Sequence, residues 1–123
     1  MLRIIGVQRS DDSQGEFVLL HNQGILKVQL RGHMVADEEG LLNLDPDRMF
    51  SFTEEELIPA GCYVILVSGQ GIGGWRKSAD GSHIYHVYWN RRTPAWADEG
   101  SPMHLLNIVH TNRPRAEGLL ISR

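Results

Sequence analysis

The chain has 123 residues, of which 41% are hydrophobic and 22% charged, and its formal net charge is −3. A chain of this length and composition is typical of one globular domain that needs no metal or disulfide to complete its core. The small net charge gives no overall attraction to nucleic acid or to an anionic membrane, so a charged partner has to be held by a local patch. We therefore expect a single domain over residues 1–123.

The N-terminal segment and the cysteine give little information on compartment. Residues 1–12 lack the apolar region and cleavage site of a secretory signal, and no apolar segment is long enough to span a membrane. Cys62 is the only cysteine, so it has no partner for an internal disulfide and leaves the redox compartment open. The localisation stays unknown from the sequence.

Short strands separated by polar turns are predicted in the first part of the chain. Leu26, Val28 and Leu30 alternate with polar residues, which is the period of a strand with one dry face. The other apolar runs end at Ser, Asp, Asn or Gly residues that favour turns. Strands are expected over residues 2–9, 16–22, 26–31 and 33–36.

The next stretch is more polar. Residues 37–48 are predicted to form a loop rich in acidic residues, and residues 50–52 a short strand. Thr53 and Glu56 have the spacing of a capping box, which favours a single helical turn, and Pro59 ends it.

The predicted centre of the fold is residues 62–67 (CYVILV). This run is apolar, β-branched and too short for a helix, so it indicates a strand buried on both faces. Residues 69–81 are rich in glycine and are predicted to form a flexible hairpin tip. Further strands are expected over residues 84–89, 103–109 and 119–122. Eight or nine short strands at this spacing predict an all-β antiparallel sandwich or barrel.

Several short motifs, taken in order, resemble the lamin-tail domain, an immunoglobulin-like β-sandwich. The matching segments are residues 15–18, 28–35, 50–52, 58–61 leading into 64–67, 69–71, 87–89 with Trp96, and 101–107. The resemblance implies an immunoglobulin-like antiparallel β-sandwich of about eight or nine strands and a habit of binding other macromolecules.

The chain departs from that family at two motifs. His33 stands where the family usually has Trp, and Ser101-Pro102 replaces a Gly-Asp or Gly-Asn turn. A coiled-coil rod and a prenylation box are also missing from the sequence. The filament role of nuclear lamins is therefore not implied, whereas the fold and a binding function are.

The sequence gives little support for catalysis or a bound cofactor. Residues 69–74 have the glycine spacing of a phosphate-binding loop, but Trp75 stands where the lysine has to follow. The six histidines are scattered, and the acidic residues 37–47 lack the spacing of a calcium loop. We predict no cofactor, no metal and no enzymatic activity.

Arginine and aromatic residues gather toward the end of the chain. Arginine beside tryptophan is typical of a protein-binding hot spot and also suits single-stranded nucleic acid. The predicted binding residues are Trp75, Arg91, Arg92, Trp96, Arg113 and Arg115.

We predict a non-enzymatic binding or scaffolding module that engages a protein partner or associates with itself through this arginine and aromatic surface. Replacing Arg91 and Arg92 by alanine is expected to weaken partner capture. The alternatives are nucleic-acid binding through the arginines of residues 91–115, and a metal-dependent hydrolase that uses gathered histidines.

Overall fold

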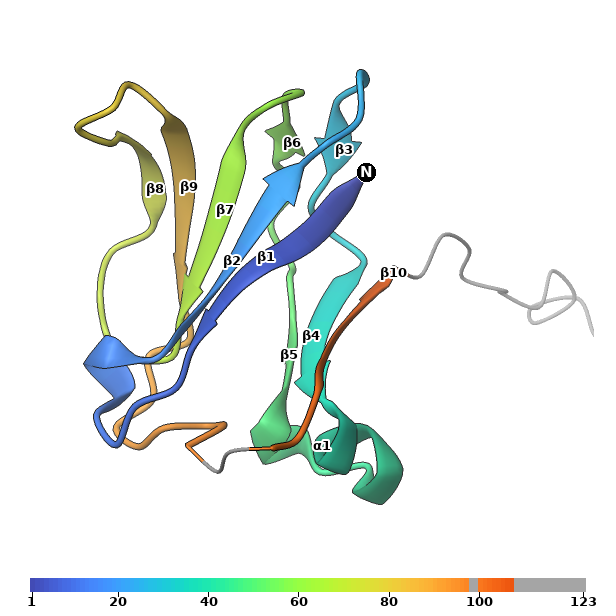
Figure 1. The fold of residues 1–123 in the computed structure, drawn as a ribbon, viewed down its shortest axis with the longest axis vertical. Coiled ribbons are helices and arrows are strands. Elements are labelled where there is room, and N and C mark those ends of the chain that lie inside the picture. The colour runs from blue at the N-terminus through green and yellow to red at the C-terminus, as the bar shows by residue number, and fades with distance from the viewer. Residues whose placement is uncertain (98–99, 108–123) are drawn as a thin grey trace, which may run out of the picture.

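The computed structural model describes residues 1–97 and 100–107 (Figure 1). Strands dominate the described residues, so the chain belongs to the all-β class. The strands are β1 (Leu2–Gln8), β2 (Phe17–Asn22), β3 (Val28–Gln29), β4 (His33–Asp37), β5 (Met49–Ser51), β6 (Leu57–Ile58), β7 (Tyr63–Val67), β8 (Gly74–Lys77), β9 (His83–Tyr88) and β10 (Met103–Asn107). The helices are α1 (Glu38–Asn43) and two 3₁₀ turns, η1 (Ser13–Gly15) and η2 (Pro46–Arg48).

The strands form three sheets. The largest has five strands in the order β1-β2-β7-β9-β8, which Figure 1 shows side by side, and the others have the orders β10-β4-β5 and β3-β6. Strand β7 is the middle strand of the large sheet. It pairs antiparallel with β2 but parallel with β9. The expectation of purely antiparallel pairing is therefore wrong at this pair, because the chain crosses over through β8 before β9 joins β7.

The hydrophobic core draws on all three sheets. Val18, Leu66 and Val87 from the five-stranded sheet are almost fully buried, and so are Val35 of β4 and Ile58 of β6. We call the side of the five-stranded sheet that meets this core the inner face, and the opposite side the outer face. Alternation along each strand sends successive side chains to the two faces.

Two predictions between residues 26 and 56 are wrong. The strand expected over residues 26–31 shrinks to β3. The Asn22 side-chain amide donates a hydrogen bond to the Leu26 carbonyl, which holds Leu26 in the connection before β3, and Leu26 is 74% exposed. The helical turn at Thr53–Glu56 does not form. The backbone carbonyl of Glu56 instead accepts a hydrogen bond from the Leu30 N–H, which keeps this stretch extended beside β3.

The predicted acidic loop contains helices. Asp37 caps α1 by accepting a hydrogen bond from the Gly40 N–H, and Glu38 and Glu39 occupy the first turn, where negative charge is favourable. Asp45 caps η2 in the same way. The prediction of a loop is therefore wrong at these helices. The capping residues are present in the sequence, but α1 is only six residues long and too short to show a helical repeat of apolar residues.

The predicted glycine-rich hairpin tip includes a strand. Residues 74–77 form β8, which pairs with β9 at the edge of the large sheet. A Cβ atom at Gly71 would lie 2.5 Å from the Tyr88 ring, and one at Gly73 would lie 2.7 Å from the His86 carbonyl oxygen. The glycines therefore serve close packing rather than phosphate binding. The strand predicted at residues 119–122, and the end of that predicted at 103–109, lie outside the described residues.

Candidate functional site

The structure separates the predicted arginine and aromatic residues. Arg91 follows β9 and places its guanidinium 4.8 Å from the centre of the Trp89 ring, while its Nε donates to the Thr93 carbonyl. Arg92 is exposed beside it. Trp75 lies on edge strand β8 opposite Tyr85, well before the end of β9. Trp75 and the two arginines therefore do not form one surface.

Trp75 occupies an acidic corner of the molecule. Its ring lies 5.3 Å from that of Tyr85, and its Nε1 donates to a carboxylate oxygen of Glu56 at 3.1 Å. Burial, followed by the negative charges of Glu54 and Glu56, raises the pKa of the Tyr85 phenol. Trp75 is 39% exposed, so it is accessible, but its neighbours differ from those that were expected.

Trp96 was wrongly predicted to be a binding residue. Its side chain is 0% exposed, and its ring packs 5.3 Å from that of Trp89. The indole Nε1 donates to the Arg48 carbonyl at 2.9 Å. A side chain so enclosed cannot touch a partner, so Trp96 belongs to the core. Arg113 and Arg115 lie outside the described residues.

A buried carboxylate fixes the loop that carries Trp96. Glu16 is 1% exposed and accepts hydrogen bonds from the Ser68 hydroxyl at 2.5 Å, the Ala95 N–H at 2.7 Å and the Trp96 N–H at 2.9 Å. Each of its two oxygens is engaged by the fold. Glu16 therefore anchors a loop instead of exchanging protons with a substrate.

A buried ion pair performs a similar task at α1. The fully buried Asp37 carboxylate accepts hydrogen bonds from Arg48 Nε and Nη2 and from the Gly40 N–H. Burial acts to raise the pKa of Asp37, but the hydrogen bonds from Arg48 and Gly40 outweigh it and hold the pKa below its usual value. Asp37 is therefore ionised and committed to structure.

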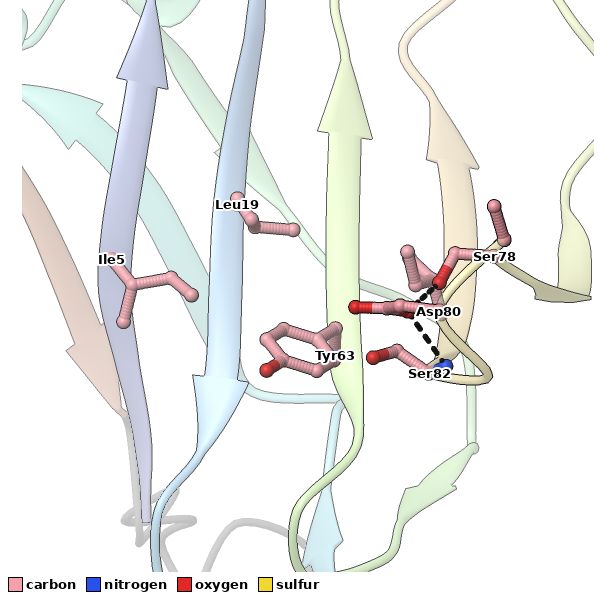
Figure 2. A pocket seen from close by; sticks show the side chains of 8 residues that line it. Ile5, Leu19, Tyr63, Ser78, Asp80 and Ser82 are labelled. Carbon is pink, nitrogen blue, oxygen red and sulfur yellow. Dashed lines mark hydrogen bonds between the residues drawn. The ribbon is translucent and has the colours of Figure 1, made fainter.

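A hollow lies on the outer face of the five-stranded sheet. Figure 2 shows side chains from β1, β2 and β7 converging there beneath the loop of residues 78–82. The hollow has a volume of about 550 Å³. We call it the outer trough, and its lining residues are Ile5, Leu19, Tyr63, Ser78, Ala79, Asp80, Ser82 and Ile84.

The floor of the outer trough is apolar and accessible. Ile5 is 45% exposed, and Leu19, Tyr63 and Ile84 are only partly buried. The strand of residues 62–67 was expected to be buried on both faces, which is wrong for Cys62, Tyr63 and Ile65, because all three are only partly buried. The apolar character of this strand on both sides is visible in the sequence, but it is equally consistent with burial and with an accessible apolar face.

The loop of residues 78–82 forms a preorganised rim. Asp80 Oδ1 accepts hydrogen bonds from the Ser78 hydroxyl and from the Ser82 N–H, as Figure 2 shows. The same hydrogen bonds lower the pKa of Asp80 to about 2, so it carries a negative charge at neutral pH. The rim therefore presents a fixed, ionised carboxylate beside an apolar floor.

The described residues contain neither a group of metal-ligand side chains nor a membrane-spanning helix. Within residues 1–97 and 100–107, no three His, Cys, Asp or Glu side chains come together to hold a metal ion. His110 lies outside these ranges. None of the helices in the described part of the chain is long and apolar enough to cross a membrane.

The chain matches no known protein-family model and no curated protein sequence.

Proposed function

We propose that this domain is a non-enzymatic binding module that holds a protein partner on the outer trough. The observation that carries the proposal is the difference in cover between the two faces of one sheet. The described chain buries the inner face, whereas it leaves Ile5, Leu19, Tyr63 and Ile84 on the outer face exposed or only partly buried. A concave apolar floor beside a few fixed polar groups is the usual form of a binding site.

The outer trough accounts for binding better than the arginine and tryptophan surface does. That surface needs Trp96, which is buried, and Trp75, which lies apart from Arg91 and Arg92. Arg91 is also engaged locally by Trp89. The absence of catalysis is part of the proposal, because the buried carboxylates of the described chain are committed to loop and helix anchoring.

We also propose that the domain has the immunoglobulin-like sandwich fold of lamin-tail domains. The sequence motifs support this proposal, together with a core shared between a five-stranded sheet and two smaller ones. A crystal structure in which the β7–β9 pair and the chain order differ from that family would contradict it.

Partner capture tests the proposed binding face. Wild-type domain, Ile84→Ser and the double variant Arg91→Ala/Arg92→Ala are each used to capture proteins from the native lysate, followed by quantitative mass spectrometry. The proposal expects Ile84→Ser to lose partners that the arginine double variant retains. Loss through the arginine double variant with full retention by Ile84→Ser would move the binding face to the end of β9.

A further inference from the structure

One register row of the five-stranded sheet has a symmetric charge pattern. Arg3 pairs with His21, His21 with Tyr63, Tyr63 with Ile84, and Ile84 with Arg76. The row crosses all five strands on the outer face and passes through the outer trough. Its centre is aromatic and aliphatic, and a guanidinium group stands at each end.

Both of these arginines lie on the exposed surface of the described chain. Arg3 and Arg76 are both exposed. Arg3 Nε donates to the Met1 sulfur, and Arg76 donates to the Ile72 carbonyl and to the Tyr88 hydroxyl. Within the described residues, neither arginine has a carboxylate in ion-pair range. The five strands themselves, all of them described, contain no Asp or Glu.

This pattern disfavours a second copy of the chain as the occupant. If two outer faces packed together about a two-fold axis parallel to the strands, the Arg3 rim of one copy would meet the Arg76 rim of the other. Like charges brought together at an interface cost free energy and act against such a pair. A partner with negative charge at both ends of an apolar centre is complementary instead.

We propose that the outer trough binds a partner segment with an apolar centre and acidic residues on both sides of it. This inference rests on the proposed function and names the chemistry of the partner. Neighbouring strands lie about 4.8 Å apart, so the four spacings from Arg3 to Arg76 span roughly 19 Å. An extended segment rises about 3.3 Å per residue, which places the acids about three residues on each side of the apolar anchor.

Asp80 provides a test of whether the partner is acidic or basic. It is the carboxylate at the rim of the outer trough, and its oxygen is already held by Ser78 and Ser82. An acidic partner gains affinity when this charge is removed, whereas a basic partner loses affinity. The variant Asp80→Asn keeps the side-chain size and the accepting oxygen, so it isolates the charge.

A phage library of random 12-residue peptides is a suitable probe, because the natural partner is unidentified. The library is selected on the wild-type domain and then depleted on Ile84→Ser, which leaves peptides that need the outer trough. The expected result is enrichment of an apolar residue with Asp or Glu about three positions away on both sides. Enrichment of Lys or Arg, or of apolar residues without acids, would overturn the inference and leave the proposed function intact.

Three other results bear on what occupies this face. If no peptide that depends on Ile84 is enriched, both the inference and the proposed function fail at this face. If a single-stranded oligonucleotide binds the wild-type domain and Arg76→Gln weakens it, the face belongs to nucleic acid. If sedimentation shows a dimer that Ile84→Ser dissociates, the occupant is a second copy. Each of these results overturns the inference.

The affinity of a selected peptide is then measured for matched variants. Arg3→Gln and Arg76→Gln are each expected to weaken binding several-fold, and Asp80→Asn to strengthen it about two- to five-fold, because rim charges act through solvent. Arg31→Gln is the control, since Arg31 pairs with Glu55 away from the five-stranded sheet. Equal losses in Arg3→Gln, Arg76→Gln and Arg31→Gln would show a general charge effect and contradict the charge pattern.

Discussion

The inner and outer faces of the five-stranded sheet differ in how far their apolar side chains are covered. In β7, Val64 and Leu66 on the inner face are 0% exposed, whereas Tyr63 and Ile65 on the outer face are partly exposed. All four side chains are apolar or aromatic. The difference shows that apolar character in a strand does not by itself mean burial within the same chain; under our proposal, a partner covers the outer face.

Polar groups show the same contrast. Around the core, Glu16 and Asp37 are buried and their oxygens are all engaged by the fold. At the outer trough, Asp80 is held by two neighbours in its own loop and remains exposed. The inner polar groups are therefore committed to the fold, whereas Asp80 at the outer trough is held only by its own loop and stays accessible.

The largest expected effect is the loss of Trp96 from the core. Trp96→Ala is expected to destabilise the domain by about 3–5 kcal/mol, as removal of a buried large aromatic side chain usually does. Chemical denaturation followed by circular dichroism measures this change. A variant of near wild-type stability that fails to capture the partner would return Trp96 to the binding surface.

A matched pair in β7 compares the two faces directly. Leu66→Ala on the inner face is expected to cost about 2–5 kcal/mol. Ile65→Ala on the outer face should cost less than half as much, because its side chain is already partly exposed to water. Urea midpoints of the two variants check the difference. Equal losses would mean that the outer face is covered within the chain itself.

Removing the charge of Glu16 should have an intermediate effect. In Glu16→Gln, the side-chain NH₂ group replaces an oxygen that accepts a hydrogen bond from a backbone N–H, so two donors face each other. The loss of such a buried hydrogen bond costs about 1–3 kcal/mol. The exposed Glu55→Gln is the control, since a surface ion pair contributes at most about 1 kcal/mol. If both variants unfold at the same urea concentration, Glu16 does not anchor the loop.

The smallest expected effect is a dependence of stability on pH through His33. Burial, opposed by a hydrogen bond to the Leu30 carbonyl, lowers the pKa of the His33 imidazole. The unfolded chain binds a proton below about pH 6.5 while the folded domain does not, so stability falls as the pH drops from that value toward the lowered pKa.

His33→Gln is the control for that measurement. Between pH 7 and 5, its free energy of unfolding should vary less than that of the wild-type domain. Identical slopes for the two proteins would exclude His33 as the source.

The sequence allowed most strands to be predicted but not their partners. The apolar runs at β2, β7 and β9 have the length and β-branching that only strands combine. The parallel pairing of β7 with β9 depends on where β8 inserts, and the glycines of residues 69–73 gave no sign of it. Trp96 was predicted at the surface because it lies in a loop of the sequence. The contact that holds its backbone in the core comes from Glu16, 80 residues away, and the sequence does not show that contact.

The outer trough was not predicted, because it joins residues of separate strands. Ile5, Leu19, Tyr63 and Ile84 are far apart in the chain and meet only through the register of β1, β2, β7 and β9. Their apolar character was visible in the sequence, but it was equally consistent with a core. Only the structure distinguishes a covered face from an open one.

Methyl NMR of the domain bound to a captured partner or selected peptide tests the central claim most directly. Outer-face methyl groups of Leu19, Ile65 and Ile84 are expected to shift on binding, while those of Val64 and Leu66 on the inner face keep their positions. Unchanged outer-face methyl signals, with shifts confined to residues around Arg91, would contradict the account.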